Sequence, residues 1–404
     1  MTILLLLLVL TTCLMIGGLL LRRAEPTPAL PPPWWLLALA CLTAAGAALE
    51  ARSGPSSALS QAALTIVAAS PACVVAARPL TARWTRVRAR RAGIGLPPFY
   101  VVRDEATLAR IVLDKHRTVT TGEMQISSVD PLDPEHRTNL LFFAGALSRR
   151  STAPFAVALA RRAGGGRVSD YRESDPNTLS GSVDRHPVRL GPPATVGMTS
   201  STGRGLTVGV EVDQRTLGTI TLEDTVRPHA REDVRRIEEL APLVLLSDDT
   251  PGNTSALGTL VGVDELVAEA DAVARLEQVQ KAHADGGRVA MIAPRQPHNE
   301  DALHAADIAV TDAATPAAPG VITLDEFDLA TADDALRRVL AGPKRIHQVE
   351  GVALALSCAG ALAGAVAPLG AYGAGASALG ASAIVAVAAW LNSRPPRALP
   401  DRSA

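Results

Sequence analysis

The most informative stretch of this chain for its fold is Ile111-Val112-Leu113-Asp114-Lys115-His116-Arg117-Thr118-Val119-Thr120-Thr121-Gly122-Glu123. Its first three residues are β-branched or aliphatic and predict a short buried strand. The strand ends on an aspartate, which is followed by a lysine and a threonine-rich turn. Open α/β folds place their chemistry at the carboxyl ends of such strands. The stretch therefore predicts a carboxylate, Asp114, at the functional edge of a sheet.

Four long stretches of the 404-residue chain carry no charged side chain, although 20% of all residues are charged. They are residues 1–21, 26–49, 54–77 and 351–393. A helix needs about 20 apolar residues to cross a bilayer. The first three stretches therefore predict one span each. The last predicts a hairpin of two spans, with its turn at Pro368 and Gly370.

Basic residues flank the predicted spans on one side of the bilayer: Arg22, Arg23, Arg78, the arginines from 83 to 91, Lys344, Arg345, Arg394 and Arg397. By the positive-inside rule, these flanks and all of residues 78–350 lie in the cytoplasm. A cleaved signal peptide is the alternative for residues 1–21, but that stretch lacks a basic leading region. We expect a multi-pass protein of the cell membrane whose partner is the lipid bilayer. A net charge of −1 does not indicate a nucleic-acid partner.

Strand-like and helix-like segments alternate between the spans, which predicts a parallel sheet covered by helices. Beyond Asp114, the predicted strands are residues 206–212, 217–222, 243–246 and 289–292, and the predicted helices are 231–240, 263–280 and 302–306. Residues from about 125 to 200 differ in kind, because a helix pair (137–150 and 153–163) precedes a turn-rich β region. We interpret them as a second domain inserted after the strand that ends at Asp114.

The segment that begins Asp114-Lys115 resembles the phosphorylation motif of P-type ATPases, Asp-Lys-Thr-Gly-Thr-Leu-Thr. Further resemblances to this family, and to its heavy-metal-transporting subgroup, lie at residues 69–79, 150–156, 217–228, 246–249, 289–308 and 391–393. Together they extend over roughly residues 34–394. The resemblance implies an α/β fold, namely a haloacid-dehalogenase-like phosphorylation domain with an inserted α+β nucleotide-type domain, plus transmembrane α-helices.

On this basis the chain divides into eight predicted parts. They are a first transmembrane helix (1–23), a transmembrane helix pair (34–80), a basic linker (81–104), the phosphorylation-like domain in two pieces (105–124 and 201–345), the nucleotide-binding-like domain between them (125–200), a C-terminal transmembrane hairpin (350–393) and a cytoplasmic tail (394–404).

The resemblance also implies roles for individual residues. Asp114 would be the nucleophile that takes the γ-phosphoryl group of ATP, and Lys115 and Thr118 would bind the phosphoryl oxygens. Asp249 and Arg275 occupy phosphate-binding positions, with Arg275 in place of a lysine. Magnesium and ATP are the implied cofactors.

Two positions of the implied magnesium site depart from the family pattern. Arg295 and Asn299 stand where the hinge motif has aspartates, and an arginine offers donors but no acceptor for a metal. We expect Arg295 to pair with Asp114 as a fixed cation, which leaves no metal site.

The other motifs are altered as well. Arg117 replaces a glycine of the phosphorylation loop, Ala153 replaces the histidine that contacts adenine, and residues 176–178 replace a Gly-x-Gly nucleotide loop, so no nucleotide-binding residue is predicted. Only residues 22–33 stand where the family has its Thr-Gly-Glu actuator domain, because Thr121-Gly122-Glu123 belongs to the phosphorylation loop.

In the predicted ion path, Ser70-Pro71-Ala72 replaces a Cys-Pro-Cys motif, and Cys73 is offset by one residue from the ligand position. A soft metal ion requires several thiolate-like donors. Cys73 therefore more often plays a packing role at such a position than a ligand role.

Three functions are compatible with this pattern. We favour a degenerate relative of heavy-metal cation-transporting ATPases that does not pump and that binds or regulates a partner, because four sites are altered together. One alternative is an active ATP-driven cation transporter that is phosphorylated on Asp114. The other is a membrane-tethered phosphatase of the haloacid-dehalogenase type that uses Asp114.

Overall fold

The computed structural model describes residues 12, 15–16, 19–20, 33–97, 108–162, 165–175, 178–198, 205–312, 320–366 and 370–394. The chain forms two compact units. The first contains Met1–Leu108, Asp307–Glu326 and Ala330–Ala404, and the second contains Ala109–Ala306 and Phe327–Leu329. Most of the predicted first span (1–23) and nearly all of the predicted tail (394–404) lie outside the described residues.

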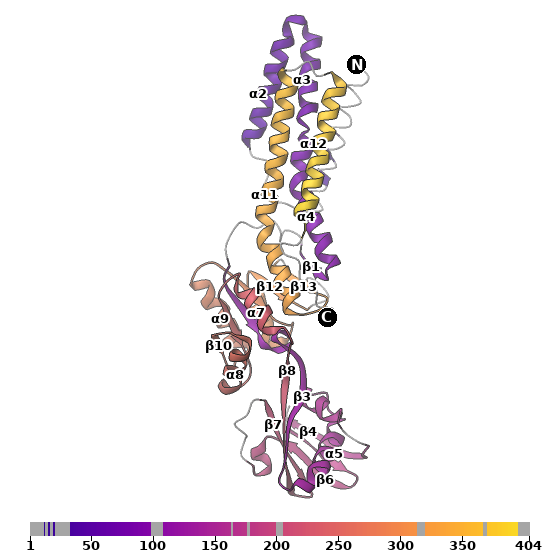
Figure 1. Ribbon diagram of the computed structural model, residues 1–404, viewed down its shortest axis with the longest axis vertical. Helices are drawn as coiled ribbons and strands as arrows, with labels where there is room; N and C mark the ends of the chain where they lie inside the picture. The colour runs from indigo at the N-terminus through magenta and orange to yellow at the C-terminus, as the bar shows by residue number, and fades with distance from the viewer. Residues whose placement is uncertain are drawn as a thin grey trace. The chain divides into compact units, whose positions relative to one another are not determined.

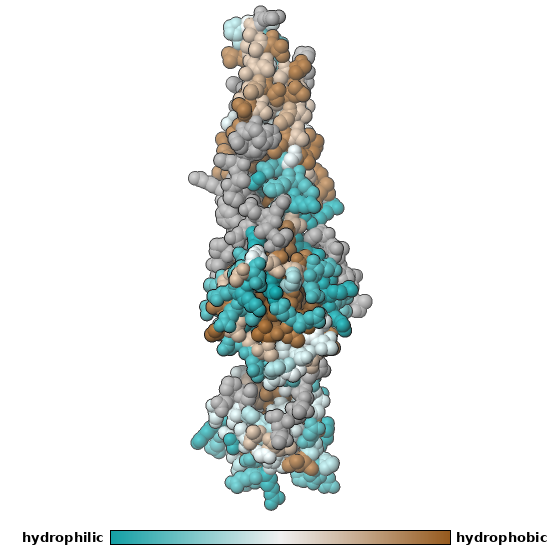
Figure 2. All heavy atoms as spheres, turned by 90° about the vertical axis from the view of Figure 1, so that its left-hand side faces the viewer, coloured by the Kyte–Doolittle hydropathy of each residue, from teal (hydrophilic) through white to brown (hydrophobic). Residues whose placement is uncertain are grey.

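Long helices make up most of the first unit (Figure 1): α2 (Pro33–Glu50), α3 (Pro55–Ala69), α4 (Pro71–Arg91), α11 (Leu329–Val366) and α12 (Ala371–Asn392). Three helical stretches, Pro55–Arg91, Leu329–Val366 and Ala371–Asn392, are long and apolar enough to cross a membrane, and the shorter Trp35–Glu50 is also apolar. The outer surface of these helices is largely hydrophobic (Figure 2). Such a surface is suited to contact with lipid chains.

Two helix boundaries differ from the expected ones. Helix α4 continues to Arg91, so the arginines from 83 to 91 lie on a helix and not in a linker over 81–104. Alanine and arginine favour helix, and Gly93 is the first strong helix breaker after them. Helix α11 begins at Leu329, well before the expected hairpin over 350–393.

Close backbone contact and buried polar pairs join the helices of this unit. A Cβ atom at Gly360 of α11 would lie 2.1 Å from the carbonyl oxygen of Ala68 in α3, so only glycine fits there. Arg78 of α4 donates to both carboxylate oxygens of Glu350 in α11, at 2.8 and 2.6 Å. Small residues and satisfied polar pairs are the contacts that hold helices together in an apolar environment.

Short strands build a parallel sheet around Asp114 in the second unit. They are β2 (Leu108–Asp114), β9 (Leu243–Leu246), β10 (Glu265–Val267) and β11 (Arg288–Ile292), in the order β11-β2-β9-β10. Strand β9 is parallel to both β2 and β10. The helices α7 (Ala230–Glu238), α8 (Pro251–Val261), α9 (Ala272–Ala284) and α10 (Glu300–Ala305) belong to the same unit. The first unit also contains three strands that are neighbours in a sheet, in the order β1 (Ile94–Gly95), β13 (Val321–Leu324) and β12 (Ile308–Thr311).

The prediction of a single helix over residues 263–280 is wrong. Residues 265–267 form strand β10, and helix α9 begins only at Ala272. The break follows from a helix cap, because the Asp271 carboxylate accepts a hydrogen bond from the Ala274 amide at 2.8 Å. Helix α8 was not expected, although Pro251 stands at its first position, where proline is favoured.

A six-stranded antiparallel sheet forms the inserted domain. Its strands are β3 (Thr120–Pro131), β4 (Val168–Asp175), β5 (Thr178–Val183), β6 (His186–Gly191), β7 (Leu206–Val212) and β8 (Arg215–Val226), in the order β3-β8-β7-β6-β5-β4. The sheet therefore spans residues 120–226, whereas the expected boundaries were 125–200. The strands expected at 206–212 and 217–222 are present, but they pair with this sheet and not with the parallel one.

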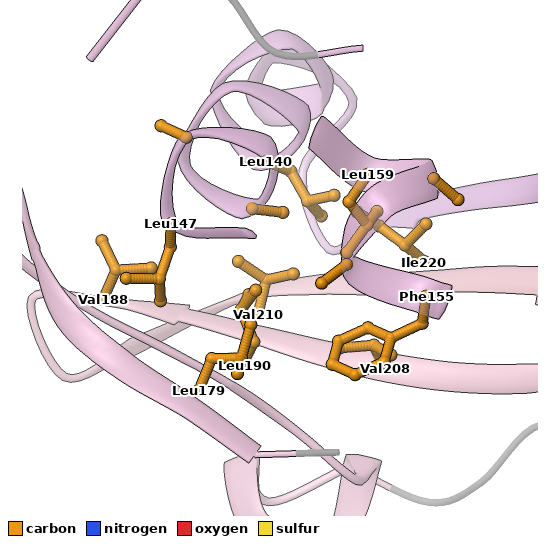
Figure 3. Close-up of a cluster of buried hydrophobic side chains, with 14 of the residues drawn as sticks. Leu140, Leu147, Phe155, Leu159, Leu179, Val188, Leu190, Val208, Val210 and Ile220 are labelled. Carbon is orange, nitrogen blue, oxygen red and sulfur yellow. The ribbon is translucent and has the colours of Figure 1, made fainter. Parts of the chain in front are cut away.

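Helices α5 (Arg137–Ser148) and α6 (Pro154–Ala160) cover one face of the inserted sheet. Leu140 and Leu147 from α5 and Phe155 from α6 point toward the buried valines and leucines of the strands (Figure 3). These side chains are almost completely buried. The inserted domain therefore has its own hydrophobic core.

Candidate active site

Asp114 ends strand β2 and is completely buried. The turn that follows, Lys115–Val119, is closed by a hydrogen bond from the Thr118 hydroxyl to the Asp114 carbonyl oxygen. Arg117 adopts a left-handed conformation there, with φ 57° and ψ 6°. This conformation costs a residue other than glycine about 1–2 kcal/mol. The loop thus keeps a backbone typical of glycine at the position where the resemblance implies one.

The Asp114 carboxylate is enclosed by two protein donors. Nη1 of Arg275, on the first turn of α9, lies 2.5 Å from Oδ1, and Nδ2 of Asn299 lies 3.1 Å from Oδ2. The arginine and the asparagine also contact each other, because Nη1 of Arg275 donates to Oδ1 of Asn299 at 3.0 Å. All three side chains are at least 99% buried. They form a closed set, which we call the Asp114 lock.

Backbone carbonyl groups hold both donors of the lock in place. Nε of Arg275 donates to the Ala270 oxygen at 3.0 Å, and Nδ2 of Asn299 donates to the Pro294 oxygen at 3.1 Å. A buried charge is tolerated only when it is paired and hydrogen-bonded, and this guanidinium satisfies both conditions. The lock is thus a well-formed element of the fold.

The cation on Asp114 is not the expected one. Arg295 pairs with Glu300 at 2.7 Å, and both side chains are 38% exposed. The expected fixed cation is present, but Arg275 supplies it. Sequence reasoning assigned Arg275 to phosphate binding because it stands at the position of a lysine. The longer, planar guanidinium instead reaches the carboxylate itself.

Lys115 points into a second cluster of charges. Its Nζ atom lies 2.7 Å from Oδ2 of Asp249 and 3.8 Å from Oδ2 of Asp224. Burial lowers the pKa of Lys115, but the charge and hydrogen bond of Asp249 outweigh burial and hold this pKa above its usual value. The ammonium group therefore stays charged at neutral pH.

Asp224, on strand β8, is a site residue that sequence reasoning missed. Its Oδ2 atom accepts a hydrogen bond from the Thr120 hydroxyl at 2.7 Å and lies 3.7 Å from Nδ1 of His116. Burial raises the pKa of Asp224, but His116, Thr120 and the charge of Lys115 outweigh burial and hold this pKa below its usual value. The sequence did contain a signal for Asp224, because it is an aspartate within residues 217–226, a strand segment that is otherwise about half apolar.

A cavity of about 480 Å³ lies beside this cluster. Lys115, His116, Asp224, Asp249 and Phe155 are among its lining residues, whereas Asp114 and Arg275 are not. A ligand in this cavity would meet the lysine and the carboxylates. It would not meet the carboxylate that the phosphorylation motif places at the centre of the chemistry.

The residues around Asp114 do not fit a magnesium ion. Magnesium needs several oxygen ligands in a nearly octahedral arrangement. Both oxygens of Asp114 accept hydrogen bonds from protein groups, and Arg275 provides donors only. Within the described ranges, no group of three or more histidine, cysteine, aspartate or glutamate side chains is placed to hold a metal.

The nucleotide-binding positions are only partly described. Ala153 precedes helix α6 and has no polar side chain to cap it, and its backbone amide donates a hydrogen bond to the Ser151 hydroxyl at 3.1 Å. Of the altered nucleotide loop, Pro176 and Asn177 lie outside the described residues, and Thr178 is buried at the start of β5.

The predicted ion-path residues are buried among the helices of the first unit. Ser70 has a left-handed backbone (φ 45°) and precedes Pro71, the first residue of α4. Its hydroxyl lies 3.3 Å from both the Ala378 carbonyl oxygen and the Ser382 hydroxyl of α12. The Cys73 thiol donates to the Ala353 carbonyl oxygen of α11 at 3.8 Å. These polar groups are therefore used in helix–helix contacts.

No protein-family model matches the chain. Its relatives include a copper-exporting P-type ATPase of Mycobacterium tuberculosis, 29% identical over 313 residues (72% of this chain and 40% of the relative). A copper-exporting P-type ATPase of Mycobacterium leprae is 27% identical over 311 residues, which again cover 72% of this chain and 40% of the relative. The chain thus spans about 40% of the length of these relatives.

A solved structure supports the same assignment at the level of the fold. The crystal structure of a zinc-transporting PIB-type ATPase in the E2.Pi state matches with a TM-score of 0.69 and 19% identity, over 93% of this chain and 66% of that one. The predicted α/β fold with membrane-spanning helices is confirmed, and so is the membrane localisation with a cytoplasmic catalytic-like part. The chain is therefore a relative of the heavy-metal-transporting P-type ATPases.

Proposed function

We propose that this chain is a non-pumping relative of the heavy-metal P-type ATPases, in which Asp114 does not accept a phosphoryl group. The observation that carries the proposal is the Asp114 lock: the Arg275 guanidinium lies 2.5 Å from the carboxylate, and no part of that carboxylate is exposed. A nucleophile must reach the phosphorus atom with a free lone pair and correct alignment. The Asp114 carboxylate is fully buried and accepts a hydrogen bond on each oxygen, so neither oxygen can reach an incoming phosphorus atom unless the lock opens.

The charge balance of the lock supports the proposal. A magnesium ion would have to displace a guanidinium that is itself held by the Ala270 carbonyl oxygen. The displaced arginine would then be a buried charge without its partner, which is strongly unfavourable. Magnesium and ATP, the implied cofactors, therefore have no role at Asp114 in the function that we propose.

The membrane part supports the same proposal. Ser70 and Cys73 bond to α12 and α11, and a soft metal ion would need several sulfur donors at this place. We infer that the chain acts as a membrane-anchored scaffold or regulator with the fold of a pump. Its lipid-facing helices anchor it, and its cytoplasmic part offers the surface on which a partner would bind.

The test is formation of an aspartyl phosphate. The full chain, reconstituted in lipid nanodiscs, is incubated with magnesium and γ-labelled ATP, quenched in acid and separated on an acidic gel. Wild type and Asp114→Asn are expected to retain equally low label. A hydroxylamine-sensitive phosphate that is present in wild type and absent from Asp114→Asn would overturn the proposal.

The same preparations separate the two alternative activities. Hydrolysis of p-nitrophenyl phosphate reports a phosphatase, and ATP turnover stimulated by copper, zinc or cadmium reports a pump. Any turnover that depends on Asp114 contradicts the proposal. Arg295→Gln is a suitable control, because it removes an arginine that pairs with Glu300 and leaves the Asp114 lock unchanged.

A further inference from the structure

An arginine-rich cluster surrounds Trp390 near the end of helix α12. The guanidinium carbon of Arg88, on the last turns of α4, lies 4.8 Å from the centre of the Trp390 ring, and that of Arg394 lies 4.9 Å from it. Both contacts are within cation–π distance. One half-exposed indole ring therefore holds two guanidinium groups close together.

Two further arginines extend this cluster on helix α11. Nη1 of Arg345 donates to the Arg394 carbonyl oxygen at 2.7 Å, so it fixes the chain directly after α12. Arg338 lies within electrostatic reach of both Arg88 and Arg345. We call Arg88, Arg338, Arg345, Arg394 and Trp390 the Trp390 cluster.

The positive charge of the Trp390 cluster is only partly balanced. Arg338 pairs with Asp334 at 2.8 Å, and the charge of Asp334 also acts on Arg345. Nη1 of Arg338 is buried and has no hydrogen-bond acceptor in the described part of the chain. Four guanidinium groups gathered around one indole ring make this place favourable for an anion.

The position of the cluster indicates which anion fits. Trp390 and Leu391 are exposed at the end of α12, and the apolar side chains of Val387 and Ile384 are exposed about one and two turns before them. Tryptophan is enriched where a helix passes from hydrocarbon to headgroups. An anion bound here would have apolar side chains on one side of it and guanidinium groups on the other. A phospholipid has this arrangement of apolar and charged parts.

We propose that the Trp390 cluster binds the phosphate headgroup of an anionic phospholipid. Arg88 and Arg394 donate to the phosphate oxygens, as guanidinium groups commonly do. Trp390 holds the two side chains at the spacing they need, and Arg338 adds positive charge from within the protein. The acyl chains lie along Ile384 and Val387. This inference does not depend on the proposed function.

The test uses the full chain in nanodiscs made of phosphatidylcholine alone or with a minor fraction of phosphatidylglycerol. Native mass spectrometry counts the lipids that remain bound, and a lipid titration in detergent gives their affinity. Wild type is expected to retain phosphatidylglycerol selectively. The double variant Arg88→Gln/Arg394→Gln is expected to lose affinity on the order of fivefold for each arginine removed.

The matched control is Arg83→Gln/Arg90→Gln. Both of these arginines are exposed on α4, the helix that carries Arg88, and the double change removes as much positive charge as Arg88→Gln/Arg394→Gln does. The control is expected to retain the wild-type affinity. An equal loss in both double variants would overturn the proposal, because it would indicate general attraction to a negative surface.

Two more arms complete the test. Arg88→Lys/Arg394→Lys keeps the charge and is expected to retain part of the selectivity, so its complete loss of binding would contradict the charge argument. Soluble glycerol phosphate provides the headgroup without acyl chains and is expected to compete poorly. Competition as strong as that of the lipid would identify a free phosphate compound as the ligand and would overturn the lipid assignment.

Discussion

Arg275 and Asp114 form an ion pair that is closed to solvent, with Nη1 and Oδ1 2.5 Å apart and exposed fractions of 1% and 0% for the two side chains. The pair joins the start of helix α9 to the end of strand β2. Asn299 completes it from the residue before α10. The pair thus links three segments of the parallel-sheet region at the place where that sheet would carry out its chemistry.

Breaking this pair should destabilise the second unit. We expect Arg275→Met to lower the free energy of unfolding by about 3–5 kcal/mol, because it leaves the buried Asp114 carboxylate without its partner. Hydrogen exchange of the β2 and α9 peptides measures this change. Tryptophan fluorescence does not, because Trp34, Trp35, Trp84 and Trp390 all lie in the other unit.

The double variant Asp114→Asn/Arg275→Met tests whether the two charges act as a pair. Removing both should cost less than the sum of the single losses, because neither charge is left uncompensated. Arg295→Gln serves as the control, and its exposed ion pair should contribute no measurable protection. Additive effects of Asp114→Asn and Arg275→Met would show that the two charges are not coupled.

His298 should make the second unit less stable in mild acid. Burial lowers the pKa of His298 below its usual 6.5, and the charge of Arg275 lowers it further. Below pH 6.5 the unfolded chain binds a proton more readily than the folded one, so stability falls as the pH decreases through this region. The difference in hydrogen-exchange protection between wild type and His298→Gln should therefore change as the pH falls below 6.5. A difference that stays constant from pH 8 to 5 would rule out this contribution.

The Arg78–Glu350 pair should stabilise the helices of the first unit. Its side chains are 14% and 9% exposed, and the contact is bidentate. Arg78→Gln or Glu350→Gln should each lower stability by about 3 kcal/mol, since each leaves one charge unpaired. Thermal unfolding followed by tryptophan fluorescence reports this loss. Arg83→Gln, on the exposed side of the same helix, should leave the transition unchanged.

Gly360 should not tolerate a side chain. A Cβ atom there would lie 2.1 Å from the backbone oxygen of Ala68, so Gly360→Ala must push α11 away from α3. We expect a loss of about 1–3 kcal/mol, as for other overpacked sites. Gly351→Ala is the matched control, because a Cβ atom at Gly351 of the same helix meets no atom within 4 Å. Equal thermal midpoints for the two variants would contradict this packing.

Local sequence patterns predicted much of the fold. The apolar run before Asp114 predicted strand β2, and Leu243–Leu246 forms strand β9 where a strand was expected. The uncharged stretches from residue 26 onward predicted the apolar helices that the structure describes. Hydrophobic length and periodicity are local properties, so they can be read without knowledge of the tertiary contacts.

Strand pairing was less predictable. Residues 206–222 have the apolar character of strands that would fit either sheet, and β8 pairs with β3, which is distant in sequence. The Trp390 cluster likewise combines residues from α4, α11 and the end of α12. Contacts of this kind depend on how the chain folds back on itself, which no short window of sequence contains.

The resemblance to heavy-metal P-type ATPases, the apolar helices from residue 33 onward and the place of Asp114 at the end of a strand could all be predicted from the sequence, because each depends on short local motifs. The surroundings of the Asp114 carboxylate could not, because they depend on tertiary contacts. The tertiary structure brings Arg275, 161 residues away, and not Arg295, to the buried oxygens. The physical reason is burial: inside the protein a charge needs a partner within hydrogen-bonding distance, and the packing of α9 against the sheet determines which arginine can provide it.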